Sequence, residues 1–168
     1  MAPLLYWSLT ALLVVVLILL GLWAFQTANR LNRLHVRYDL SWQALDAALA
    51  RRAVVARAIA ADAYRATTQG TRLRTLADSA EQAPRYAREG CENELSTELT
   101  LLDADVVPPD LMDELAEAES RVLLARRFHN DAVRDTLALR EQRPVRWLKL
   151  GGHAPLPTYF EIAETAQR

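Results

Sequence analysis

The chain has 168 residues, a formal net charge of -1 and a single cysteine, Cys91. This near-neutral balance argues against a dedicated nucleic-acid-binding protein, which normally carries a clear basic excess. One cysteine excludes an intrachain disulfide, and the length allows one membrane span and one domain.

The N-terminal part of the chain is uncharged. Residues 1–29 contain no Asp, Glu, Lys or Arg, and residues 4–25 read LLYWSLTALLVVVLILLGLWAF. A helix of this length spans about 33 Å, enough to cross the hydrocarbon core of a bilayer. Trp7 and Trp23 lie near its ends, where aromatic rings favour the headgroup level. A cleaved signal peptide is the alternative, but no basic residue precedes the apolar run and no small-residue cleavage site follows it, so we expect an uncleaved transmembrane anchor over residues 1–29.

The residues that flank this segment predict its orientation. Arg30, Arg33 and Arg37 follow the apolar run, whereas no Lys or Arg precedes it. The positive-inside rule then places the C-terminal domain in the cytoplasm. We therefore expect a single-pass protein of the cytoplasmic membrane.

The segment after the anchor has the apolar periodicity of a bundle helix. Between residues 26 and 68 there is neither Pro nor Gly. Apolar residues recur there in steps of three and four that average about 3.5, as in helices packed in left-handed bundles. The positions are Leu31, Leu34, Tyr38, Trp42, Leu45, Leu49, Ala53, Ala56, Ile59 and Ala63. No helix breaker separates this segment from the anchor, so we expect one continuous helix that stops at residues 67–70.

Three further helices are predicted, over residues 72–82, 85–105 and 110–142. Prolines separate them, and Asp110 is placed to N-cap the last one. The apolar positions of that last helix are Leu111, Leu115, Ala118, Val122, Ala125, His129, Ala132 or Val133, Thr136 and Leu139. Period-two alternation is absent, so the fold class is all-α. We expect an antiparallel helical bundle over residues 30–143 and an irregular tail over residues 144–168, with Gly151-Gly152 in a turn.

Charge is segregated along the chain. Residues 26–91 carry a net charge of +5, residues 92–120 a net charge of -10, and residues 121–168 a net charge of +4. The favoured interpretation is an acidic segment packed between basic helices. The alternatives are an exposed acidic face for a basic partner and a patch for a divalent metal.

The sequence lacks the motifs of a catalytic or metal site. Helical bundles can hold di-iron centres through Glu-x-x-His pairs, but no Glu stands three residues before His35, His129 or His153. There is no Cys-x-x-Cys, phosphate loop or His-Glu-x-x-His motif. We therefore expect no enzyme, no cofactor and no metal. His129 is interpreted as a satisfied core residue beside Asn130 that can titrate near neutral pH.

The C-terminal tail interleaves basic residues with Trp147 and Leu148. This pattern suits an anionic membrane surface. The alternative is that Trp147 and Leu148 cover the end of the bundle while the arginines are solvated.

Several segments resemble LemA family proteins, in the order in which that family carries them. Residues 41–46 (SWQALD) are similar to the segment after the family's membrane helix, and residues 92–96 (ENELS) to its middle helix. Residues 109–111 (PDL) resemble its proline break, residues 125–135 (ARRFHNDAVRD) match most closely, and residues 157–161 (PTYFE) are similar to its ending. The positions that carry the resemblance are Trp42, Asp46, Arg51, Arg52, Arg126, Arg127, His129, Asn130, Tyr159 and Phe160.

The resemblance implies an N-terminal anchor and a LemA-like four-helix up-and-down bundle. The chain would be a divergent member, because Thr136-Leu137 stand where the family tends to repeat Tyr-Asn. The family has no established catalytic activity, and some of its members are associated with organising or remodelling membranes.

We therefore expect a membrane-anchored, non-enzymatic scaffold or interaction module. Its expected partners are the lipid bilayer and either further copies of itself or other membrane proteins, with no nucleic acid and no small-molecule substrate. One alternative is a sensor or adaptor that passes a signal along the continuous first helix. The other is a metal-dependent hydrolase that uses the acidic residues 92–119.

Overall fold

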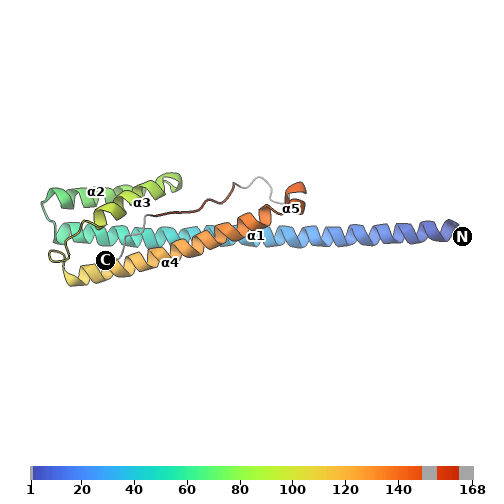
Figure 1. Cartoon of the computed structure of the whole chain (residues 1–168), viewed down its shortest axis with the longest axis horizontal. Helices are drawn as coiled ribbons and strands as arrows, with labels where there is room; N and C mark the ends of the chain where they lie inside the picture. The colour runs from blue at the N-terminus through green and yellow to red at the C-terminus, as the bar shows by residue number, and fades with distance from the viewer. Residues whose placement is uncertain (1, 149–154, 163–168) are drawn as a thin grey trace. The chain divides into compact units, whose positions relative to one another are not determined.

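A computed structural model describes residues 2–148 and 155–162 of the chain, and over these residues it contains helices and no strands (Figure 1). The all-α fold class is therefore confirmed for the described part. The helices are α1 (Ala2–Asp62), α2 (Thr68–Gln82), α3 (Arg85–Leu99), α4 (Pro109–Arg140) and α5 (Arg143–Trp147).

The chain divides into two compact units. Unit 1 comprises Met1–Tyr38 and Ala132–Pro157, and unit 2 comprises Asp39–Asp131 and Thr158–Arg168. Helices α1 and α4 each contribute residues to both units.

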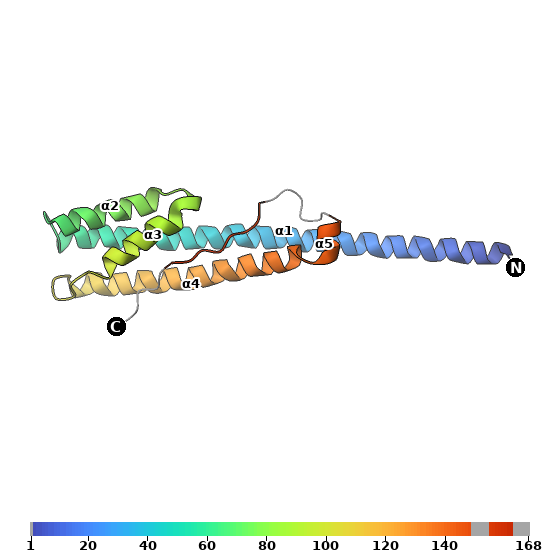
Figure 2. The ribbon, with the colours of Figure 1, turned by 45° about the horizontal axis from the view of Figure 1, so that its top comes forward.

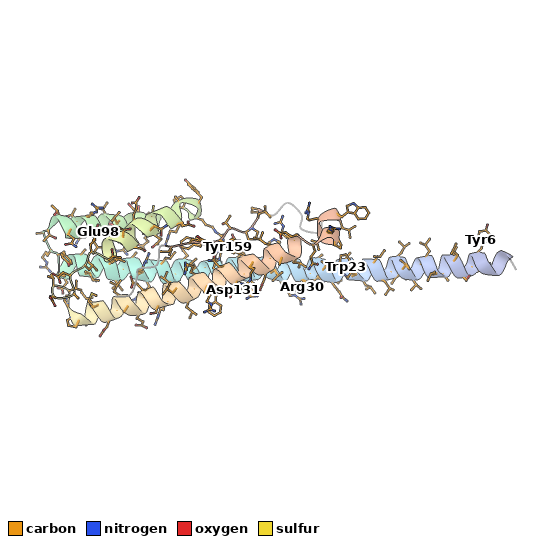
Figure 3. All side chains as sticks on the ribbon, in the orientation of Figure 1. Tyr6, Trp23, Arg30, Glu98, Asp131 and Tyr159 are labelled. Atoms are coloured by element: carbon orange, nitrogen blue, oxygen red, sulfur yellow. The ribbon has the colours of Figure 1, made fainter. Side chains whose placement is uncertain are left out.

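The first part of α1 is an exposed apolar surface. Of the helices that the structure describes, α1 is the one long and apolar enough to cross a membrane, and no residue of its apolar window is buried. We call residues 6–25 the apolar segment. The exposed fractions of its large hydrophobic residues range from 38% for Trp23 to 76% for Trp7. Figure 3 labels Tyr6 and Trp23, which lie toward the two ends of this segment.

The core of unit 1 joins α1, α4 and α5. Leu31 of α1, Leu139 of α4 and Val145 of α5 are each at most 4% exposed and form one cluster, against which Leu34 packs. Figures 1 and 2 agree in placing α5 beside α1. Arg37 and Asp135 form an ion pair of 2.9 Å in the same unit. The apolar positions predicted for this part of α1 and α4 therefore do face one another.

The core of unit 2 receives side chains from four helices. Its larger cluster is built from Ala53, Val55, Ala56, Ile59 and Ala60 of α1, Leu73, Ala77 and Ala80 of α2, Leu95 and Leu99 of α3, and Leu115 and Ala118 of α4, with Tyr64 and Val107 from the connections. Most positions predicted from the apolar periodicity are buried here, including Leu45 and Leu49 at 0% exposed.

The first predicted helix boundary was wrong. Helix α1 ends at Asp62, and residues 67–70 open α2 instead of stopping α1. Thr67 is the N-cap of α2, and its Oγ1 accepts a hydrogen bond of 3.0 Å from the Gly70 amide. Between the two helices Ala66 adopts a left-handed backbone with φ of 62°. A Cβ atom on Gly70 would collide with the Tyr64 carbonyl oxygen, so the turn requires glycine at this position.

Two other boundaries also differ from the prediction. Helix α3 ends at Leu99 instead of residue 105. Beyond it, the amides of Leu101 and Leu102 donate to carbonyl oxygens three residues back, and the Asp103 amide donates to Tyr64 Oη at 2.9 Å. Helix α4 begins at Pro109, so Asp110 lies in the first turn and is not the N-cap. Proline is favoured at that position because its fixed φ suits a helix and its missing N–H has no helical partner.

The predicted irregular tail contains one short helix, α5, followed by extended chain over residues 155–162. The turn predicted at Gly151-Gly152 lies outside the described residues.

Candidate functional site

Unit 2 holds its own C-terminal segment in an aromatic and polar site, which we call the C-terminal clamp: Trp42, Arg85, His129, Asn130 and Phe160. The Trp42 ring meets the rings of His129 and Phe160 edge-on, with centroids 5.6 and 5.7 Å away. The Arg85 guanidinium carbon lies 4.1 Å from the centroid of the Trp42 ring. Such edge-on and cation–π contacts each add about 0.5–1.5 kcal/mol to the burial of the rings.

Asn130 binds the main chain of the C-terminal segment. Its Nδ2 donates to the Phe160 carbonyl oxygen at 3.0 Å, and its Oδ1 accepts from the Phe160 amide at 2.9 Å. A strand partner would satisfy the same two backbone groups, so one amide side chain here replaces a neighbouring strand. The Phe160 ring is 3% exposed and packs in a cluster with Leu45, Leu49 and Val122.

His129 lies at the centre of the clamp and is 1% exposed. Its Nδ1 is 3.1 Å from Ser41 Oγ. Burial lowers the pKa of His129 below its ordinary value of 6.5, and the positive charge of Arg85 lowers it further, whereas a hydrogen bond with the Thr158 backbone raises it. Burial is the largest of these effects. The lowered pKa favours a neutral imidazole at pH 7.

A buried ion-pair network begins at Arg52 of α1, three residues beyond Leu49. The Arg52 side chain is 4% exposed and donates to Glu92 Oε2 at 2.7 Å and to Ser96 Oγ at 3.0 Å. Glu92 is fully buried and also binds Arg88 Nε, at 3.0 Å. Arg88 extends the network to Asp46, at 3.2 Å. One buried carboxylate therefore holds two guanidinium groups.

This network also affects a carboxyl group on α4. Burial raises the pKa of Glu119 above its ordinary value of 4.5, while the charge of Arg52 lowers it, and burial is the larger effect. Arg52 Nε has no hydrogen-bond partner among the described residues. Arg52 is therefore held chiefly through its terminal nitrogens, on α3.

The acidic residues 92–120 pair with basic residues on one side, which is one half of the predicted packing between two basic regions. In addition to the two pairs of Glu92, Glu98 binds Arg72 at 2.7 Å and Glu114 binds Arg51 at 3.1 Å. Each of these arginines comes from residues 26–91, so the basic partner of the acidic segment is the N-terminal basic region. In residues 121–168, Arg121 binds Glu117 within α4.

No protein-family model, curated protein or solved structure matches the chain.

The positions that carry the LemA resemblance fall into three groups. Trp42, His129, Asn130 and Phe160 meet in the C-terminal clamp, and Arg126 donates to the Ile162 carbonyl oxygen at 3.5 Å beside it. Asp46 and Arg52 belong to the buried ion-pair network. Arg51, Arg127 and Tyr159 are exposed. Of the predicted membrane flank, Trp7, Trp23, Arg30, Arg33 and Arg37 are likewise exposed.

Four residues of these sites were not among the predicted site residues: Ser41, Arg85, Arg88 and Glu92. Ser41 and Glu92 do lie in segments that carry the resemblance. A signal was present for two of them, because Arg88 and Glu92 are spaced i, i+4 on one helix. The burial of Arg52 also had a signal, since it lies seven residues from both Leu45 and Ile59 and so shares their helix face.

The geometry is that of a binding and packing site. Ser41 and His129 form a hydroxyl–imidazole pair, which nucleophilic catalysis can use, but the imidazole is closed off by its burial. Over residues 2–148 and 155–162, no three His, Cys, Asp or Glu side chains gather as a metal-binding group. What the clamp does is hold an extended segment by its main chain and one aromatic side chain.

Proposed function

We propose that the chain is a membrane-anchored, non-enzymatic helical protein that acts as a scaffold or interaction module at the membrane surface. The observation that supports this most is the exposure of the apolar segment of α1. Soluble monomers rarely expose contiguous apolar surface of more than a few hundred Å². About twenty helical residues match the thickness of a bilayer core, where that surface is favourable.

The proposed topology has a single span with the C-terminal domain in the cytoplasm. It is supported by the exposed Arg30 and Arg33, which directly follow the apolar segment. A cleaved signal peptide would also be apolar and N-terminal, so the test must include the size of the mature protein.

The anchor is tested by expressing the full chain and washing membranes with alkaline carbonate. We expect the protein to stay in the membrane pellet at full length, with Met1 or Ala2 at its N-terminus. A reporter that works only in the cytoplasm should be active when it is fused to the C-terminus. A reporter that works only outside the cytoplasm should be inactive there. Release by carbonate, or a mature N-terminus beyond residue 25, would exclude the anchor.

A divergent LemA-like four-helix bundle is our proposal for the domain. It is supported by the gathering of resemblance positions in the C-terminal clamp and the buried ion-pair network. Positions that recur in a family for structural reasons should gather in a few packed sites, and six of the ten belong to one of these two.

The scaffold function predicts self-association or binding to other membrane proteins. Crosslinking in native membranes, followed by native mass spectrometry of the purified protein, should give discrete oligomers or a defined complex. An isolated monomer in both measurements would remove the support for a scaffold.

A second candidate is a sensor or adaptor that passes a signal along α1. The supporting observation is that α1 runs without a break from Ala2 to Asp62 and supplies residues to both units. Ala28→Pro interrupts its hydrogen bonding between the apolar segment and Leu31. The sensor hypothesis expects lost signalling with normal membrane insertion, whereas equal effects on both would contradict it.

The metal-dependent hydrolase remains the third proposal. Glu94 is exposed, but Glu98 is 4% exposed and bound to Arg72. Metal analysis of the purified protein, compared with the Glu94→Ala and Glu98→Ala variants, tests this directly.

A further inference from the structure

Helix α5 carries exposed arginines in unit 1, in addition to Arg30 and Arg33 of α1. Arg143 and Arg146 are exposed, and Trp147 is 87% exposed, although Val145 between them is buried at 1%. This five-residue helix therefore buries one apolar side chain and presents two cations and a large aromatic ring to its surroundings. An exposed Trp needs an explanation, because its ring is favoured at interfaces where one end is apolar and the other wet.

The packing of Val145 fixes where α5 lies along α1. Val145 shares a cluster with Leu31 of α1 and Leu139 of α4, so α5 sits at the level of Leu31. Leu31 follows Arg30 directly and lies six residues beyond Phe25, the end of the apolar segment. At a rise of 1.5 Å per residue that is about 9 Å. The headgroup layer on each side of a bilayer core is about 5–8 Å thick, so this level is its outer boundary.

We call Arg30, Arg33, Arg143, Arg146 and Trp147 the basic collar: Leu31 stands between the two α1 arginines in the sequence, and Val145, which packs against Leu31, stands between the two α5 arginines. Figure 3 labels Arg30 and Trp23 on α1. Among the residues that the structure describes, none of these four arginines forms a salt bridge. By contrast, Arg37, the next basic residue of α1, is bound to Asp135.

We propose that the basic collar binds the headgroups of anionic phospholipids, and that α5 is a second membrane contact of the chain. The proposal rests on the proposed anchor, which brings the collar to the bilayer. The occupant follows from continuity and charge: the collar begins where the apolar segment ends, and unpaired guanidinium groups bind phosphate well. The exposed Trp147 adds a ring of the type that anchors helices at the interface.

The test uses the full chain in vesicles of phosphatidylcholine mixed with phosphatidylglycerol. Spin-labelled lipids of each headgroup report which lipid the protein retains at its surface. The variant is Arg143→Gln with Arg146→Gln, because Arg30 and Arg33 also govern the insertion of α1. The matched control is Arg65→Gln with Arg74→Gln, which removes the same charge from exposed positions of unit 2.

We expect the wild-type protein and the control to prefer phosphatidylglycerol severalfold over phosphatidylcholine. The α5 variant should lose that preference by a factor on the order of five or more, since each arginine near an anionic surface adds about that much to binding. Equal preferences in the α5 variant and the control would overturn the proposal. So would a wild-type protein that does not discriminate between the lipids, which would leave an acidic protein segment as the collar's partner.

A second measurement guards against a folding defect in the α5 variant. In a Cys91→Ala background, a nitroxide on Leu148→Cys should collide less often with an aqueous nickel chelate, relative to oxygen, than the same label on Ser120→Cys of unit 2, because the headgroup layer excludes part of the chelate. A water-exposed label at position 148, in protein that withstands alkaline carbonate, would refute the collar and leave the anchor intact. Release by carbonate would refute the anchor itself.

Discussion

Arg52 of α1 and Glu92 of α3 are joined by a 2.7 Å ion pair in which neither side chain is more than 4% exposed. Glu92 also holds Arg88, so the carboxylate is shared between two cations. Removing one partner of a buried pair leaves an uncompensated charge in the core, which is a larger penalty than the pair's own contribution. The adjacent Arg51 binds Glu114 with both side chains half exposed, which gives a natural comparison at the next position.

Glu92→Gln should therefore destabilise the protein strongly. We expect a loss of about 3–5 kcal/mol in the free energy of unfolding, because two guanidinium groups lose their counter-charge in a buried site. The measurement is chemical denaturation of the full chain in detergent, followed by tryptophan fluorescence. Arg51→Gln is the control and should cost at most about 1 kcal/mol. Equal losses for the two variants would show that burial does not set the strength of these pairs.

Phe160→Ala should release the C-terminal segment while the helices of unit 2 remain folded. The ring is 3% exposed in an apolar cluster, and the hydrogen bonds of Asn130 alone do not replace its burial. Hydrogen exchange of residues 158–162 should then speed up on the order of tenfold or more. Tyr159→Ala is the control, since Tyr159 is 47% exposed, and its exchange should change little.

Asn130→Asp tests the polar half of the C-terminal clamp. The carboxylate keeps an acceptor for the Phe160 amide but loses the donor to the Phe160 carbonyl oxygen. We expect a cost of about 1–3 kcal/mol to the docking of the segment, because a carbonyl group loses its partner and a charge is placed near the core. Hydrogen exchange of the Phe160 amide measures this. Unchanged exchange would mean that Asn130 does not hold the segment.

The burial of His129 makes stability depend on pH. Its pKa is lowered in the folded protein, so the unfolded chain binds the proton more readily. The stability of the folded protein is therefore undiminished above pH 6.5, the ordinary pKa of histidine. Part of it is lost as the pH falls from there to the lower pKa of His129 in the folded state. We expect the unfolding free energy to decrease on acidification below 6.5, and His129→Gln to remove that dependence. Glu119, whose pKa is raised, makes the folded state more stable as the pH falls. The His129→Gln variant keeps this opposite dependence on pH.

Two glycines should respond oppositely to the same substitution. Gly70→Ala places a methyl group against the Tyr64 carbonyl oxygen and should destabilise the protein by about 1–3 kcal/mol. Gly90 lies inside α3 with no atom within 4 Å of an added Cβ, so Gly90→Ala should stabilise it by about 0.5–1 kcal/mol. Thermal unfolding by circular dichroism distinguishes the two. Stabilisation by Gly70→Ala would contradict the turn described for residues 63–70.

Helix faces could be predicted from the sequence because apolar spacing is a local property. The buried faces of α1 and α4, including His129, follow directly from steps of three and four. Helix ends could not be predicted equally well. Thr67 was interpreted as the end of one helix, because threonine is favoured both at helix starts and in turns. Whether it ends α1 or begins α2 depends on the close approach of Gly70 to Tyr64 across the turn.

The two sites were harder to predict than the helices. The clamp joins Trp42 to Phe160 across more than a hundred residues, so no local pattern links them. The buried ion-pair network required knowing that α3 packs against α1, since charged residues are expected at the surface unless they are paired. Sequence reasoning found Arg52 only as part of a resemblance and missed that Glu92 neutralises it.

The clamp of Asn130 has a consequence for the alignment of the C-terminal segment. Asn130 binds main-chain atoms, which every residue offers, so these two bonds alone would accept the segment after a slip of one residue. Such a slip would place Tyr159 in the cluster of Leu45, Leu49 and Val122, where its hydroxyl would be buried among aliphatic groups. The register is therefore set by which of the two neighbouring aromatic residues lacks a hydroxyl group. Exchanging them, by Phe160→Tyr combined with Tyr159→Phe, should shift the segment by one residue.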